Sequence, residues 1–73
     1  MRRGTVNEFD DPKGYGTIRA DDGVEYFFHC TRIADGSRTI APGAPVTFSV
    51  VPGHRGRYEA ADIIELPLAK IVH

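Results

Sequence analysis

Two short segments rich in glycine and aromatic residues constrain this chain more than any other part of it. The first reads Lys-Gly-Tyr-Gly-Thr-Ile at 13–18, and the second reads Tyr-Phe-Phe-His-Cys at 26–30. The turn Ala-Asp-Asp-Gly at 20–23 lies between them, and its Asp-Gly pair tolerates the positive φ that tight hairpin turns require. The sequence therefore predicts a β-hairpin formed by these two segments.

Alternation along the two strands sorts their side chains onto two faces. Tyr15 and Thr17 share one face of the first strand, and Phe27 and His29 share one face of the second. Pairing the strands would bring Tyr15, Phe27 and His29 onto one open face beside Lys13. Two aromatic rings, an imidazole and an ammonium group on one surface suit the stacking of unpaired nucleic-acid bases.

Three consecutive aromatic residues in the second segment cannot all face a core, because the side-chain period of a strand is two. We expect Tyr26 and Phe28 to fill the core and Phe27 to face solvent beside His29. An exposed phenylalanine without a function is a solubility liability, so we interpret Phe27 as a contact residue. A surface histidine alone would be unremarkable, but its offset from Phe27 favours a contact role for His29 as well.

A wider set of residues resembles the bacterial cold-shock domain family. The matching residues are Gly4-Thr5-Val6, Phe9-Asp10, Lys13-Gly14-Tyr15-Gly16, Ile18, Asp22-Gly23, Phe27-Phe28-His29, Ile33, Thr39-Ile40, Gly43, Val46-Thr47-Phe48, Gly53, Arg55-Gly56 and Ala60-Ala61-Asp62-Ile63. They include two ribonucleoprotein-type motifs at the separation that the family has. The resemblance implies an all-β fold, a five-stranded antiparallel barrel of the oligonucleotide-binding (OB) type, which binds single-stranded RNA or DNA and catalyses no reaction.

The resemblance also implies roles for individual residues. Phe9 would stack on bases together with Tyr15 and Phe27, while His29 would stack or donate a hydrogen bond. Lys13 and Arg55 would contact phosphates, although Arg55 fits a solvated turn equally well. The implied partner is single-stranded RNA or DNA, bound without a cofactor or a metal ion, in the role of an RNA chaperone or a regulator of transcription or translation.

Four residues stand where the family commonly has an aromatic side chain: Glu8, Thr17, Cys30 and Ser37. Each base–aromatic stack contributes about 1–3 kcal/mol, so the loss of two stacks would weaken binding by about 3 kcal/mol, or more than a hundredfold. We therefore predict attenuated binding, with a micromolar or weaker dissociation constant.

Acidic residues and an apolar tail leave a second interpretation open. Glu8, Asp10 and Asp11 would repel phosphate, or they would simply solvate a loop. We expect a domain at 1–65 and an apolar extension at 66–73, which would dock on its own barrel, form a weak homodimer or stay disordered. The chain would then be a protein-interaction or self-associating OB module with little nucleic-acid binding.

Composition sets the outer limits of these interpretations. Seventy-three residues make one domain, and nine Lys/Arg against ten Asp/Glu give a net charge of −1. Nucleic-acid binders are usually basic, so bases must supply much of any affinity here. The single cysteine excludes an internal disulfide and suits a reducing compartment, and no signal peptide or membrane-length apolar run is present, so we expect a cytoplasmic protein that does not bind membranes.

An enzyme is the least expected class. A nucleophile and its base must lie within hydrogen-bond reach, whereas adjacent strand residues point to opposite faces, which would separate Cys30 from His29. Cys30 is expected to be a small packing residue, because no second cysteine could resolve an oxidised thiol. No phosphate-cradling loop or metal-ligand spacing occurs either.

The remaining patterns predict the other elements of the barrel. Val46, Phe48 and Val50 alternate with polar residues and should point inward. The glycines at 14 and 16 indicate tight curvature, or they let a base approach Tyr15 closely. The expected strands are 2–9, 13–20, 24–30, 46–50 and 58–64, with a single helical turn at 31–33 capped by Thr31.

Overall fold

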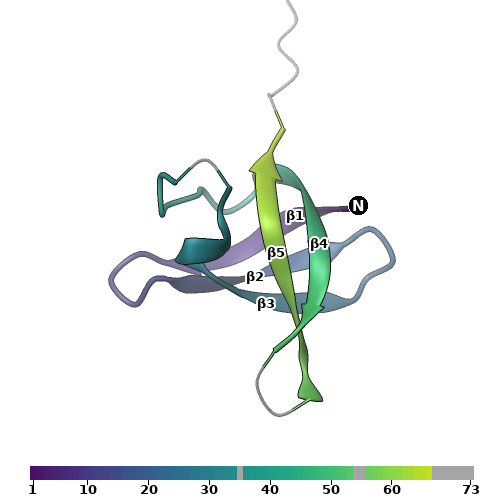
Figure 1. Cartoon of the computed structure of the whole chain (residues 1–73). Coiled ribbons are helices and arrows are strands. Elements are labelled where there is room, and N and C mark those ends of the chain that lie inside the picture. The colour runs from purple at the N-terminus through teal and green to yellow at the C-terminus, as the bar shows by residue number, and fades with distance from the viewer. Residues whose placement is uncertain (35, 54–55, 67–73) are drawn as a thin grey trace, which may run out of the picture.

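The computed structural model describes residues 1–34, 36–53 and 56–66. These residues form a closed barrel with the strand order β1-β2-β3-β5-β4 (Figure 1). Its elements are β1 (Arg2–Asp10), β2 (Tyr15–Ala20), β3 (Glu25–His29), the 3-10 helix η1 (Cys30–Arg32), β4 (Pro45–Pro52) and β5 (Tyr58–Glu65). The prediction of an all-β, five-stranded barrel is confirmed. No helix among the described residues has the length and apolarity that a membrane crossing requires.

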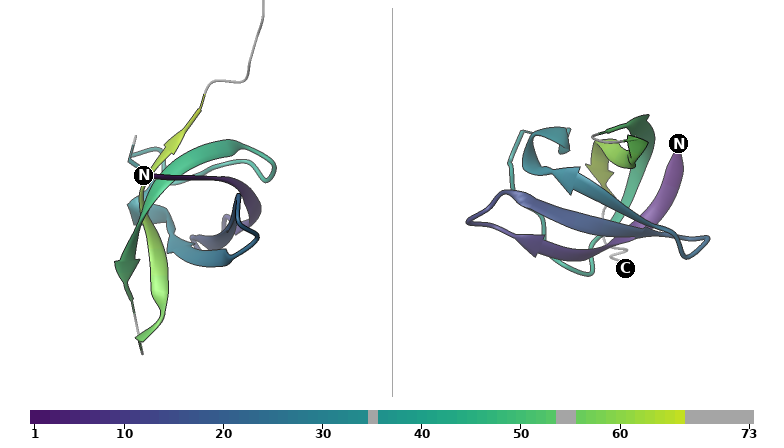
Figure 2. Two further views of the ribbon diagram at one scale, coloured as in Figure 1. Left: turned by 90° about the vertical axis from the view of Figure 1, so that its right-hand side faces the viewer. Right: turned by 90° about the horizontal axis from the view of Figure 1, so that it is seen from below.

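The direction of the strand pairs differs from the prediction at one place. The pairs β1–β2, β1–β4, β2–β3 and β4–β5 are antiparallel, as expected. The pair β3–β5 is parallel, with Phe27 opposite Glu59. This parallel contact closes the barrel, and Figure 2 shows the resulting curvature of β1, β2 and β3 from two further sides.

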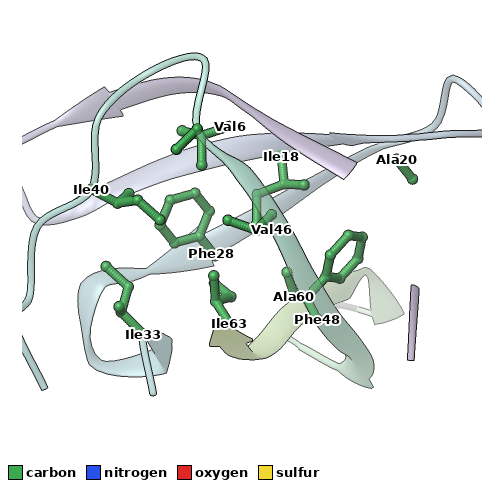
Figure 3. Close-up of a cluster of buried hydrophobic side chains, with 11 residues drawn as sticks. Val6, Ile18, Ala20, Phe28, Ile33, Ile40, Val46, Phe48, Ala60 and Ile63 are labelled. Atoms are coloured by element: carbon green, nitrogen blue, oxygen red, sulfur yellow. The ribbon is translucent and has the colours of Figure 1, made fainter. Parts of the chain in front are cut away.

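The barrel interior is filled by side chains from all five strands and from the segments that follow η1 (Figure 3). Phe28 and Phe48 are the largest of the fully buried side chains, and Val46 is buried with them, as the alternation predicted. Val50 is only half-buried and packs against this cluster. Tyr26 also lies at the edge of the core, where its ring centroid is 5.6 Å from that of Phe48.

Two β-bulges shift the side-chain phase of strands that the sequence alone treats as regular. In β1, Val6 pairs with Ile18 and Glu8 pairs with Thr17, so Asn7 is an extra residue. Asn7 and Glu8 are consecutive and both exposed, which a regular strand with one buried face would not allow. The bulge therefore turns Glu8 to the solvent side of the sheet.

The second bulge lies in β5. Asp62 and Ile63 together oppose the single residue Phe48 of β4. Asp62 adopts a φ of 51°, in the left-handed region, and its side chain is exposed. This bulge lets Ala60 and Ile63, which are three residues apart, both point into the barrel interior.

The connections around β2 and β3 are tighter than predicted. β2 begins at Tyr15 because the backbone amides of Lys13 and Gly14 both donate to the carbonyl oxygen of Asp10, which forms a turn. The predicted turn at 20–23 is confirmed: Gly23 has a φ of 89° and its amide donates to the Ala20 carbonyl. The prediction that Thr31 caps the helical turn was wrong, since η1 begins at Cys30 and His29 is its N-cap.

Candidate nucleic-acid interface

The solvent-facing side of β1, β2 and β3 carries most of the predicted contact residues, and we call it the outer face. Strand register arranges its side chains in rows that cross the three strands. One row is Asp10–Tyr15–His29, and the next is Glu8–Thr17–Phe27. The paired residues Arg19 and Glu25 extend the face beyond Thr17 and Phe27.

The structure brings Tyr15, Phe27 and His29 together as the hairpin pattern predicted. Tyr15 is directly opposite His29, and Phe27 is its diagonal neighbour. The ring centroids of Tyr15 and Phe27 are 5.3 Å apart, with an angle of 39° between the ring planes. The two residues keep 36% and 42% of their surface exposed, and His29 is exposed beside them. Flat ring surface is therefore accessible at two adjacent points of one sheet.

Hydrogen bonds at the end of β3 determine the orientation and tautomer of His29. The backbone amide of Thr31 donates to Nδ1 of His29 at 3.3 Å, and Thr31 Oγ1 lies 3.1 Å from the same nitrogen. A backbone amide can only donate, so Nδ1 is the acceptor and a neutral ring carries its hydrogen on Nε2. His29 can therefore offer an N–H donor to a ligand while the capping interaction holds its ring in place.

The predicted separation of Cys30 from His29 was wrong. The strand ends at His29, so the alternation of strand faces no longer applies to Cys30, and its Sγ lies 3.9 Å from His29 Nδ1. That nitrogen already accepts the Thr31 amide hydrogen. Cys30 is half-buried against the core, which agrees with a packing role.

The other three predicted contact residues differ in their accessibility. Phe9 is half-buried and stacks on Phe28, with centroids 5.7 Å apart and planes inclined by 8°, so one of its ring faces is occupied by the core. Lys13 is exposed in the turn between β1 and β2, near the edge of the outer face. Arg55 lies outside the described residues.

A groove of about 770 Å³ runs beside the aromatic pair. Its lining includes Phe27, Tyr15, Thr17 and three carboxylate residues: Glu8, Asp10 and Asp11. Asp11 also holds the neighbouring loop, because its Oδ1 accepts a hydrogen bond from Thr39 Oγ1 at 2.9 Å. The position of Glu8 within this groove follows from the bulge in β1, which no local sequence signal indicated.

A polar network occupies the opposite end of the outer face. Arg19 forms an ion pair with Glu25 at 3.2 Å, and the amide nitrogen of Asn7 lies 3.5 Å from the same Glu25 oxygen. Asn7 also donates to Thr17 Oγ1 at 3.4 Å. The charge of Arg19 is therefore partly compensated by its neighbour, which reduces its attraction for phosphate. In the described part of the chain, no three His, Cys, Asp or Glu side chains come together in a way that could hold a metal ion.

Comparison with known proteins identifies the family to which this chain is similar. The family model described as 'Cold-shock' DNA-binding domain matches residues 2–66. Cold shock protein CspB of Bacillus caldolyticus is 40% identical over 67 residues, which cover 90% of this chain and all of that protein. Glycine-rich protein 2 of Nicotiana sylvestris is 44% identical over 63 residues, which cover 84% of this chain and 29% of that protein.

A solved structure supports the same assignment. The structure titled "drosophila Unr CSD456" superimposes with a TM-score of 0.76 at 29% sequence identity, over 97% of this chain and 29% of that one. The predicted resemblance is confirmed, and the barrel is of the OB type found in cold-shock domains. The chain belongs to the cold-shock domain family of nucleic-acid-binding proteins.

Proposed function

We propose that this chain binds single-stranded RNA or DNA through the outer face, with successive bases stacked on Tyr15 and Phe27. The observation that carries the proposal is the exposed ring pair, whose centroids are 5.3 Å apart beside the exposed His29. Stacking on aromatic rings tolerates any base, because every base has a π-face. His29 supplies a hydrogen-bond donor next to the rings, and Lys13 lies in position to meet a phosphate at the edge.

The affinity of this face is expected to be lower than that of a cold-shock domain with a full set of aromatic residues. Glu8 and Thr17 occupy positions of the outer face where the family commonly has rings, and three carboxylates line the adjoining groove. The net charge of −1 adds no general attraction for phosphate. Weak binding suits an RNA chaperone or a regulator that must leave its target quickly.

A titration of the full chain with a fluorescein-labelled oligothymidylate tests this proposal, with anisotropy as the readout. The label is needed because the chain has no tryptophan. We expect a micromolar or weaker dissociation constant, and amide chemical-shift changes confined to β2, β3 and the adjoining part of β1. Nanomolar affinity at physiological salt would contradict the attenuation, and the absence of binding would contradict the function.

Self-association through residues 66–73 remains the alternative. Residues 67–73 lie outside the described residues, whereas the backbone amide of Leu66 still donates to the Pro45 carbonyl at 2.8 Å. A truncation after Leu66 therefore removes residues 67–73 and keeps this hydrogen bond. Light scattering of both chains tests the alternative, with each measured mass divided by the mass of the corresponding monomer. A larger ratio for the full chain alone would support self-association through the tail, and equal ratios would reject it.

A further inference from the structure

Glu8 lies in the same row of the outer face as one of the two exposed rings. It pairs with Thr17, and Thr17 pairs with Phe27, so these three residues cross β1, β2 and β3 in register. Two strand spacings, roughly 10 Å, separate the backbone of Glu8 from that of Phe27. A base stacked on Phe27 that extends over β2 would present its edge to the Glu8 side chain.

The space between Glu8 and Phe27 is open. Thr17 has a small side chain, and its hydroxyl oxygen accepts a hydrogen bond from the side-chain amide of Asn7 at 3.4 Å. Glu8, Thr17 and Phe27 all line the 770 Å³ groove. A base edge can therefore enter this part of the groove without displacing a ring.

The carboxylate of Glu8 is available to a ligand. Among the described residues, Glu8 takes part in no ion pair or side-chain hydrogen bond, and its side chain is exposed. Asp10, in the neighbouring row, is different because its Oδ1 lies 3.3 Å from the Lys13 backbone amide, which donates to it. Of the two carboxylates in these rows, Glu8 is the one without a local partner.

The chemistry of a carboxylate restricts the base it accepts. An ionised carboxylate has two acceptor oxygens and no donor. Guanine is the one common base whose Watson–Crick edge carries two adjacent donors, N1–H and the N2 amino group. Uracil and thymine place their single N3–H between two carbonyl oxygens, and adenine and cytosine place an amino group beside a ring acceptor. Single-stranded bases are read on these edges, because stacking on a protein ring leaves the edges exposed.

We propose that Glu8 makes the base position on Phe27 selective for guanine, through a bidentate pair between its carboxylate and the N1–H and N2–H groups. This inference rests on the proposed single-strand binding at the outer face. Glu8 acts as a specificity-determining residue: it repels phosphate, so the edge of a base rather than the backbone faces β1. The carboxylate that lowers affinity for strands in general thus raises affinity for one base.

The test compares oligothymidylates that carry a single central guanine, inosine, cytosine or adenine. A single guanine avoids association between guanine-rich strands, and inosine lacks only the N2 amino group. For the unmodified chain we expect about tenfold tighter binding of the guanine strand than of oligothymidylate, with inosine between them, since one good bidentate pair discriminates by about this much.

Glu8→Gln tests the residue itself, because it keeps the size of the side chain and replaces one acceptor oxygen by a donor. We expect the guanine preference to fall to twofold or less, while oligothymidylate binds more tightly. Asp21→Asn is the matched control, because it removes one negative charge from an exposed turn outside the outer face and should keep the preference. Circular dichroism verifies that each variant is folded.

The outcomes separate the two proposals. Equal affinity of the unmodified chain for all five strands would overturn guanine selection and leave single-strand binding intact. A guanine preference that persists in Glu8→Gln would also overturn it, because another residue would then read the base. No binding of any strand would overturn single-strand binding, and guanine selection with it.

Discussion

Tyr15 and Phe27 are diagonal neighbours on adjacent strands, with ring centroids 5.3 Å apart and planes inclined by 39°. The inclination means that one flat ligand cannot lie on both rings at once, whereas two successive bases with different orientations can. The twist between neighbouring strands, roughly 20–25°, contributes to this inclination. The pair is therefore suited to a flexible single strand rather than to a rigid duplex.

Removal of the Phe27 ring should weaken binding strongly. We expect Phe27→Ala to lower affinity for a short oligothymidylate about tenfold, which corresponds to the loss of one base stack. Ile64→Ala is the control, because Ile64 is 46% exposed and pairs with Thr47 of β4, on the far side of β5 from Phe27. An equal loss in both variants would argue against a specific role for Phe27. Fluorescence anisotropy measures both.

Addition of rings to the outer face should have the opposite effect. Thr17 is half-buried between Glu8 and Phe27, so Thr17→Phe would place a third ring beside the existing pair. We expect a gain in affinity of about fivefold or more, the lower end of one stacking contribution. Val24→Phe adds an exposed ring outside β3 and should change affinity little. A similar gain in affinity in this variant would indicate nonspecific hydrophobic binding.

Binding should depend only weakly on salt. Each phosphate contact on a single strand contributes about 0.7 to the slope of log K against log salt concentration. Among the described residues, Lys13 is exposed beside the outer face, whereas Arg19 on that face is paired with Glu25. We expect a total slope of magnitude about 1–2 between about 50 and 200 mM salt. Lys13→Ala should lower that magnitude by about 0.7 if Lys13 meets a phosphate. An unchanged slope in this variant would remove Lys13 from the interface.

Gly16 should be needed for folding rather than for ligand access. A side chain at Gly16 would overlap the backbone carbonyl of Glu8 on the neighbouring strand. We expect Gly16→Ala to reduce the free energy of unfolding by about 1–3 kcal/mol, as overpacking does. Urea denaturation measures this loss. Gly36→Ala serves as the comparison, because a side chain there would meet open space at a φ of 77°. We expect it to reduce the free energy of unfolding by about 1 kcal/mol.

The left-handed conformation of Asp62 predicts an order of stability among substitutions. Aspartate, asparagine and glycine tolerate a φ of 51°, whereas β-branched residues do not. We expect Asp62→Asn to be nearly neutral, Asp62→Ala to cost about 1 kcal/mol and Asp62→Val to cost about 2 kcal/mol. Thermal unfolding gives this order directly. Equal midpoints for all three would show that the bulge in β5 does not constrain the residue.

Alternation within the hairpin of β2 and β3 was sufficient to predict where Tyr15, Phe27 and His29 lie. Both strands are regular, and the turn that joins them is encoded locally by Asp-Gly, so the register followed without knowledge of the rest of the fold. Phe28 was assigned to the core by the same argument and is fully buried. The binding role of these exposed residues stays a prediction.

The features that sequence did not predict depend on contacts between distant or irregular segments. No glycine or proline marks the bulge at Asn7 in the sequence. Which of Glu8 and Phe9 faces solvent therefore could not be predicted from β1 alone. The parallel closure of β3 on β5 joins segments about thirty residues apart. The N-cap at His29 depends on where β3 ends, which is among the least reliable features to infer from sequence.

The extra residue in β1 has a consequence for how this surface can change. If β1 kept all of its residues but paired with β2 without the bulge, it would keep a single phase: the carboxylate of Glu8 would point toward the barrel interior and the ring of Phe9 toward solvent. Placing an unpaired carboxylate in an apolar interior is costly, so a register without the bulge is disfavoured for folding before any ligand is involved. The bulge therefore keeps the carboxylate of Glu8, rather than the ring of Phe9, on the side of the sheet that a nucleotide would meet.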